Sequence, residues 1–109
     1  MDKIIAALRV FRDDRDWTKF HTARNLATSV SIEAAELLEH FQWDVGDEDS
    51  LEIEREAVAG ELADVLIYLL MLFDKLGLDP ATEAMRKIES NSHRFPVGSQ
   101  PGKRRRQGA

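Results

Sequence analysis

The chain has 109 residues, of which 32% are charged and 43% hydrophobic, with a formal net charge of −5 and no cysteine. This balance predicts one folded domain and excludes a disordered chain, a disulfide framework and a thiolate metal site. No apolar run reaches the ~18 residues of a membrane span and the N-terminus lacks the layout of a signal peptide, so we expect a cytoplasmic protein with no membrane association.

The first two elements are predicted to be helices, because prolines occur only at 80, 96 and 101 and no strand-like alternation stands out. The first helix is expected over residues 2–15 and a linker over residues 16–25. The second helix is expected from about Ala23 to Phe41. Apolar residues recur with helical spacing in both; they are Ile4, Ile5, Leu8 and Phe11 in the first, and Leu26, Val30, Ala34, Leu37, Leu38 and Phe41 in the second.

The third helix is expected over residues 51–76, after a loop at 43–50. Asp49 or Ser50 would cap its start, and Gly77 would end it in a left-handed conformation. Residues 62–72 are apolar on more than one face, which a chain of this size cannot cover alone. We therefore expect a homo-oligomer, with this helix at the contact between copies.

The fourth helix is expected from Asp79 as N-cap and Pro80 at the first helical position to about Ser92. Four helices of this size predict an all-α, four-helix bundle. The bundle domain is expected over residues 1–96, and residues 97–109 are expected to form a flexible basic tail.

The charge is unevenly distributed along the chain. The segment 103–106, KRRR, carries +4, so the rest of the chain carries −9. An acidic body disfavours direct binding to a nucleic-acid polymer, although divalent cations can bridge acids to a smaller polyanion. We interpret the basic segment as solubilising, with nucleic-acid or phosphate binding as the alternative.

Two acid pairs are the main chemical signal. Glu33 and Glu36 are three residues apart on the second helix, and Glu61 and Asp64 are three apart on the third, so each pair shares one helical face. If the pairs face each other, the carboxylates must be protonated or must hold a cation. Oxygen ligands alone favour Mg²⁺, Mn²⁺ or Ca²⁺.

Two other interpretations compete with a metal site at these acids. Acids three apart often belong to solvated helix faces, which is the stronger objection for Glu33 and Glu36. It is weaker for Glu61 and Asp64, because the residues that follow them leave little solvent face. A di-iron carboxylate centre requires Glu-x-x-His motifs, and His40 completes none.

Aromatic and polar residues suited to a nucleotide gather in the linker, at the end of the second helix and late in the fourth. Aromatic rings can stack on a base and Asn can read its edge, while cationic side chains suit phosphate. Each residue alone could equally be structural, so only their grouping points to a binding site. They are Trp17, Phe20, His21, Arg24, Asn25, Trp43, Lys87, Asn91 and Arg94.

The motifs RDWTKFH, RNL, EAAE, FQW and ELADVLIYL, in that order and followed by KIESNSHRFP, resemble the MazG-like all-α nucleoside triphosphate pyrophosphohydrolases. Within that family they are most similar to the dCTP pyrophosphatase group. The resemblance covers roughly residues 4 to 97. It implies a four-helix bundle assembled as a homo-oligomer, a tetramer being favoured over a dimer.

The resemblance also implies an activity, a cofactor and roles for residues. The activity would be Mg²⁺-dependent hydrolysis, with Mn²⁺ as a substitute, of a nucleoside triphosphate such as dCTP or a modified dCTP to the monophosphate and pyrophosphate. The metal ligands would be Glu33, Glu36, Glu61 and Asp64. The base and sugar would contact Trp17, His21, Asn25, Trp43 and Tyr68, and the phosphates would contact Lys87, Asn91 and Arg94.

Two alternatives remain open from the sequence. The same family could act on another nucleotide, such as dUTP or a phosphoribosyl nucleotide. A non-catalytic helical module that binds nucleotides or a partner protein is the alternative from a different functional class, although such a module has no need of four converging carboxylates.

Overall fold

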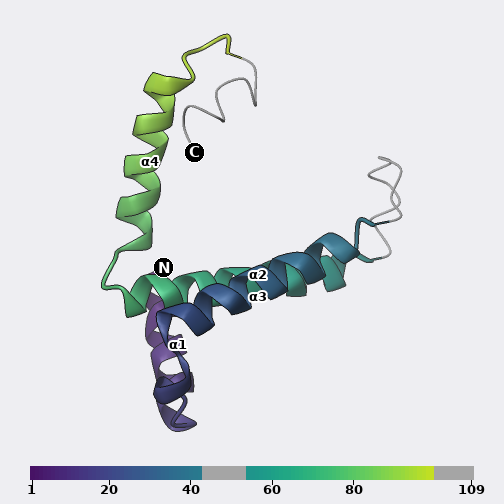
Figure 1. Ribbon diagram of the computed structural model, residues 1–109, viewed down its shortest axis with the longest axis vertical. Coiled ribbons are helices and arrows are strands. Elements are labelled where there is room, and N and C mark those ends of the chain that lie inside the picture. Colours follow the sequence, from purple (N-terminus) through teal and green to yellow (C-terminus); the bar gives the residue numbers. More distant parts are fainter. Residues whose placement is uncertain (43–53, 100–109) are drawn as a thin grey trace. The chain divides into compact units, whose positions relative to one another are not determined.

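The computed structural model describes residues 1–42 and 54–99 (Figure 1). The chain divides into two compact units, residues 1–78 and residues 79 onward, each of which is described by itself. The described residues contain helices and no strand, which confirms the all-α class. None of the helices in these two ranges combines the length and apolarity needed to cross a bilayer.

The first unit contains α1 (Asp2–Asp14), the short 3₁₀ helix η1 (Thr18–Phe20), α2 (Ala23–Glu39) and α3 (Arg55–Lys75). Figure 1 shows α2 and α3 running side by side. The C-cap of α2, His40, lies near the first residues of α3, so the two helices are antiparallel. Helix α1 packs against the C-terminal half of α3, where a small cavity is lined from both helices.

The segment expected to be a linker is more ordered than its sequence suggested. Asp16 follows the end of α1 with a φ of 54°, in the left-handed region. The backbone N–H of Trp17 donates to the carbonyl of Arg12 at 3.0 Å, as in a helix-terminating Schellman turn. η1 follows directly, so the direction in which Trp17 leaves α1 is fixed by backbone hydrogen bonds.

The ends of α2 and α3 differ somewhat from the predicted ones. The side chain of Thr22 caps α2 by accepting from the backbone N–H of Asn25 at 3.1 Å. The helix ends at Glu39, before the predicted Phe41, and turns carry the chain to residue 42. The predicted loop at 43–50, the candidate caps Asp49 and Ser50 and residues 51–53 lie outside the described residues. The end of α3 is confirmed, because Gly77 has a φ of +70°.

Only three hydrophobic side chains in the described ranges are buried, Ile5 of α1, Leu26 of α2 and Leu70 of α3. The expected apolar stripe of α2 is partly wrong, because Leu38 and Ala34 are exposed. On α3, three leucines with i, i+4, i+7 spacing are exposed by 52%, 38% and 36%; they are Leu62, Leu66 and Leu69. One face of α3 is therefore not covered by the described residues.

An ion pair joins α1 to α3. The guanidinium of Arg9 donates to both carboxylate oxygens of Asp74, with Nε 3.1 Å from each, and Arg12 lies 3.6 Å from the same carboxylate. Asp74 is the more enclosed partner, since 19% of its side chain is exposed against 55% for Arg9. The pair fixes α1 at the end of α3 distant from Glu61.

The second unit contains α4 (Pro80–Arg94), which extends two residues beyond the predicted end. The predicted start is confirmed, because the Asp79 carboxylate accepts from the backbone N–H of Thr82 at 2.9 Å and from its hydroxyl at 2.7 Å. Lys87, Asn91 and Arg94 recur at i, i+4 and i+7 and therefore share one face of α4.

Replacing Asp74 with Asn is expected to destabilise the chain at neutral pH and to remove part of its acid sensitivity. The hydrogen bond from Arg9, opposed by burial, is the main reason that the pKa of Asp74 lies below its ordinary value. Because the folded-state pKa is below the unfolded one, the stabilisation is present above the unfolded pKa and is lost as pH falls through the folded pKa.

Thermal unfolding at about pH 7 and about pH 3 measures this effect. Asp74→Asn should lower Tm by a few degrees at the higher pH and much less at the lower. The control is Asp14→Asn, which makes the same chemical change at the last residue of α1. Equal Tm losses at both pH values would show that charge pairing is not what Asp74 contributes.

Candidate functional site

Three carboxylates meet between α2 and α3. Glu33 projects from the middle of α2, and Glu61 and Asp64 project from α3. Each offers an oxygen within 4.8 Å of the others. The antiparallel pairing explains the meeting, because it places the middle of α2 opposite the first half of α3. The i, i+3 spacing then turns Glu61 and Asp64 to the same side. We call these three residues the acid cluster.

The acid cluster is electrostatically unfavourable unless something neutralises it. The pKa of Glu33 is raised to about 7, first by burial, then by a hydrogen bond with Glu36, and then by the charges of Glu36, Asp64 and Glu61. Glu36, the fourth predicted ligand, therefore lies beside Glu33 although it is outside the acid cluster. A proton shared near neutral pH is one way for the group to reduce its repulsion.

A divalent cation is the other way, and the residues fit one. Glu33 Oε2 and Glu61 Oε2 are buried and have no hydrogen-bond partner within the described residues. Buried oxygens without donors are costly in a folded protein, and a hard cation would supply the missing interaction. A set of carboxylate oxygens with no Cys or His among them suits Mg²⁺, Mn²⁺ or Ca²⁺.

His40 borders the acid cluster, and the sequence interpretation gave it no role. Its Nε2 lies 3.8 Å from Glu61 Oε1, and its Nδ1 lies 3.4 Å from Glu54 Oε2. A signal was present in the sequence, because His40 comes seven residues after Glu33 and four after Glu36. Those spacings place it on the same face of α2 as the two acids.

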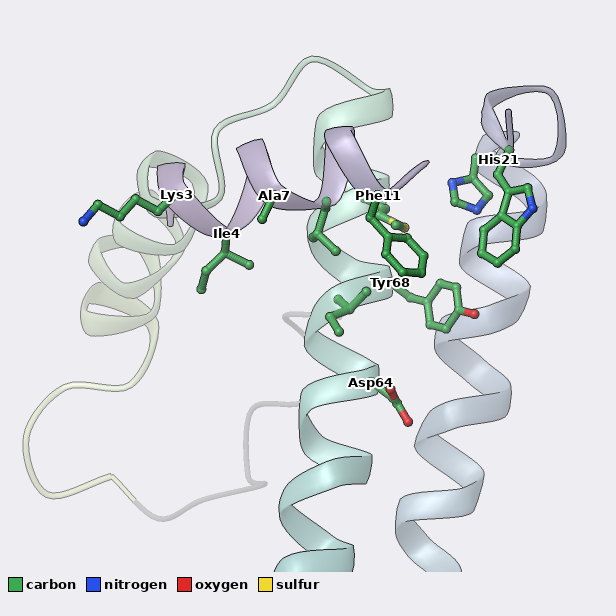
Figure 2. A pocket seen from close by; sticks show the side chains of 11 residues that line it. Lys3, Ile4, Ala7, Phe11, His21, Asp64 and Tyr68 are labelled. Carbon is green, nitrogen blue, oxygen red and sulfur yellow. The ribbon is translucent and has the colours of Figure 1, made fainter. Parts of the chain in front are cut away.

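A cavity of about 580 Å³ opens next to the acid cluster, between α1, η1 and α3. Figure 2 shows Phe11 of α1 and Tyr68 of α3 on facing walls, with Asp64 one turn before Tyr68. Asp64 belongs to both the acid cluster and the cavity wall. The volume is in the range of small-molecule sites. The lining residues are Lys3, Ile4, Ala7, Leu8, Phe11, Trp17, His21, Asp64, Ile67, Tyr68 and Met71.

The aromatic part of the wall is held by ring contacts. Trp17 meets Phe11 edge-to-face with centroids 5.7 Å apart, and its ring centroid is 6.4 Å from that of His21. The guanidinium carbon of Arg15 lies 3.6 Å from the Phe11 ring centroid. These contacts restrict the orientation of Trp17, whose side of the cavity offers a flat surface for a planar ligand.

His21 contributes an uncharged polar group to the same wall. Burial, and secondarily the charge of Arg12, lowers the pKa of His21 below its ordinary value. Its Nδ1 is buried without a hydrogen-bond partner among the described residues. A neutral imidazole can donate from one ring nitrogen and accept at the other, so His21 could bind the polar edge of a ligand.

The remaining predicted site residues are not gathered here. Asn25 does not line the cavity, and its side-chain Nδ2 instead donates to the backbone carbonyl of Phe20 at 3.0 Å. It therefore joins η1 to α2. Trp43 lies outside the described residues. Lys87, Asn91 and Arg94 belong to the second unit, so the structure gives no distance from them to the acid cluster.

Sequence reasoning also missed the contribution of α1 to the cavity. Ile4, Leu8 and Phe11 read as core positions from their spacing, yet they line the cavity, together with Lys3 and Ala7. Ile4 and Phe11 are each 43% exposed. Helical periodicity identifies an apolar face without indicating whether a protein core or a ligand covers it.

Comparison with known proteins agrees with this geometry. A model of the MazG-like family matches residues 28–106. The chain is 37% identical to dCTP pyrophosphatase 1 of Bos taurus and 38% identical to that of Homo sapiens, each over 91 residues. These matches cover 80% of this chain and 54% of the relatives, so the chain spans about half the length of the curated relatives that it matches.

A solved structure matches over most of its length. The crystal structure of a pyrophosphatase from Archaeoglobus fulgidus superposes with a TM-score of 0.83 and 46% sequence identity, covering 88% of this chain and 92% of the archaeal one. The agreement in sequence and in helical architecture, together with the family match over most of the chain, leads to one conclusion. This chain belongs to the MazG-like family.

Proposed function

We propose that this protein is a Mg²⁺-dependent nucleoside triphosphate pyrophosphohydrolase that releases pyrophosphate from dCTP or a modified dCTP. The observation that carries the proposal is the double role of Asp64, which is at once part of the acid cluster and part of the wall of an apolar cavity. A nucleotide has two corresponding parts, a planar base that suits an apolar cavity and a polyanion that suits a cation held by acids.

The base belongs in the cavity and the phosphates belong at the acid cluster. Trp17 and Tyr68 provide aromatic surface for the base, and neutral His21 provides polar contacts for its edge. The acids cannot bind phosphate directly, because both are anionic, so a cation is required between them. Lys87, Asn91 and Arg94 of α4, and Trp43, complete the substrate contacts in this proposal.

The chain's own residues then have distinct tasks. Bound Mg²⁺ would neutralise the phosphates and make phosphorus more open to attack by water. Glu33, Glu61 and Asp64 would hold the cation, and Glu36, which lies beside Glu33, would act as a further ligand or as the proton acceptor. A carboxylate that is not fully engaged with the cation could accept the proton of the attacking water.

The identity of the base is supported by the relatives rather than by the geometry. The bovine and human relatives are called dCTP pyrophosphatase 1, whereas an aromatic wall can stack on any base. dUTP is therefore the alternative substrate within the same chemistry. A binding module without catalysis is the alternative outside it.

We also propose that the protein works as a homo-oligomer, with a tetramer favoured over a dimer. The exposed leucines of α3 lie on one helical face, and the described part of the chain leaves them uncovered. A leucine buried at a contact contributes roughly 1.5–3 kcal/mol relative to an exposed one. A second copy of the chain is the partner that the proposal names.

Pyrophosphate release from each canonical dNTP and NTP, and from 5-methyl-dCTP, tests the proposed function. The assay is run with Mg²⁺ and with EDTA. Mg²⁺-dependent release that is highest for a cytosine deoxynucleotide is expected. If release is highest from dUTP, dUTP replaces dCTP as the proposed substrate. If no nucleotide releases pyrophosphate, the proposed enzymatic activity is contradicted.

Asp64→Asn is expected to lower kcat/KM for pyrophosphate release by at least about 100-fold, since replacing even outer-shell partners of a metal costs about 10- to 100-fold. The substitution removes charge without changing size, so circular dichroism and Tm should stay close to wild type. Glu39→Gln, an equivalent change at an exposed acid of α2, is the control. Full activity in Asp64→Asn would exclude Asp64 from the metal site.

Glu33→Gln is expected to stabilise the metal-free protein at about pH 8 while abolishing its stabilisation by Mg²⁺. The raised folded pKa of Glu33 means that its ionisation costs stability, which falls as pH rises from the unfolded pKa toward about 7. At about pH 5 the two proteins should unfold at similar temperatures. The measurement is Tm by differential scanning fluorimetry; an unchanged response to Mg²⁺ would contradict the ligand role.

Leu66→Glu is expected to dissociate the homo-oligomer, because it places a charge in the middle of the exposed leucine face of α3. Size-exclusion chromatography with light scattering gives the mass of the assembly. Met85→Glu, at an exposed position of α4, tests whether any added acid has this effect. A wild-type protein that elutes as a monomer would contradict the oligomer directly.

A further inference from the structure

His40 lies between Glu61 of α3 and Glu54, the N-cap residue that precedes α3. It is the C-cap residue of α2, and its two ring nitrogens face carboxylate oxygens of Glu54, at 3.4 Å, and of Glu61, at 3.8 Å. Glu54 and Glu61 are seven residues apart, two helical turns on one side of the helix. His40 therefore contacts α3 next to the acid cluster without being one of its three members.

The two contacts differ in their surroundings. Exposure is 22% for the His40 side chain and 23% for Glu61, but 53% for Glu54. Electrostatic interactions are screened less where both partners are withdrawn from water. The contact with Glu61 is longer than a hydrogen bond, so the ring acts on this carboxylate through its dipole. It is nevertheless the better shielded of the two contacts.

The state of the Glu61 carboxylate shows what this contact does. Oε1 faces His40, whereas Oε2 is buried and has no hydrogen-bond partner among the described residues. A carboxylate with only one oxygen attracted to a neighbour has a preferred rotation about its last bond. Outer groups that orient metal ligands in this manner raise the affinity of the site.

We propose that His40 is a positioning residue that orients Glu61 for the divalent cation, an inference that rests on the proposed function. The imidazole attracts Oε1, which leaves Oε2 as the oxygen for the metal. His40 is the C-cap of α2 and Glu61 belongs to α3. A change in the distance between the two helices would therefore also change the orientation of Glu61 in the acid cluster.

Three variants separate this role from a merely structural one. His40→Leu removes both polar contacts. His40→Gln places an amide N–H close to where Nε2 stands, facing Glu61. His40→Asn has a shorter side chain and places its amide close to Nδ1, facing Glu54. The readout is the Kd for Mn²⁺ alone, measured by electron paramagnetic resonance of the free ion, with Tm of the metal-free protein measured in parallel.

His40→Leu and His40→Asn should both weaken Mn²⁺ binding by about tenfold or more, while His40→Gln should stay close to wild type. A Mn²⁺ Kd that is unchanged in His40→Leu overturns the proposal, even if Tm falls. Retention of binding in His40→Asn but not in His40→Gln also overturns it, because the contact with Glu54 would then be the one that matters. If His40→Leu fails to fold, the comparison of Gln with Asn decides.

The proposed function and this inference fail in different ways. A wild-type protein that binds no Mn²⁺ and releases no pyrophosphate contradicts the proposed function, and the inference falls with it. A wild-type protein that does both, with His40 variants of unaltered Mn²⁺ affinity, contradicts the inference alone.

Discussion

Repulsion among carboxylates held between two antiparallel helices is the constraint around which this structure is organised. Helix α2 brings Glu33 opposite Glu61 and Asp64 of α3, with their oxygens within 4.8 Å of one another. Burial raises the pKa of Glu33 to about 7, with further contributions from a hydrogen bond with Glu36 and then from the charges of Glu36, Asp64 and Glu61. Such a group is stable only when a proton or a cation is shared within it, so the same repulsion that costs stability prepares a cation site.

The other elements of the first unit place a cavity on one side of the acid cluster. The Arg9–Asp74 ion pair holds α1 at the distal half of α3, and the Schellman turn at Asp16 fixes the exit of Trp17 from α1. A cavity with apolar and aromatic walls therefore begins where the acid cluster ends, at Asp64. Charge at one end and aromatic surface at the other is the arrangement that a nucleotide with its cation requires.

The described residues of one chain bury little hydrophobic surface. Burial of only three hydrophobic side chains in the described ranges is little for a unit with three helices, and the leucine face of α3 has no cover there. An enzyme whose α3 carries metal ligands on one side and a contact surface on the other would couple assembly to catalysis. Helix α3 has apolar residues on two sides, one that lines the cavity and one that carries the exposed leucines.

The sequence by itself determined the helices and the acid pairs, since both depend on local spacing. The caps at Thr22 and Asp79, the end at Gly77 and the shared face of Glu61 and Asp64 follow from residues close together in the chain. Only the tertiary structure decided which faces meet. It turned Asn25 to the backbone of Phe20, exposed Leu38, placed α1 in the cavity wall and brought His40 to Glu61. The physical reason is that helical periodicity fixes the direction of a side chain around its own axis, whereas the neighbour that it meets is chosen by packing between residues distant in sequence.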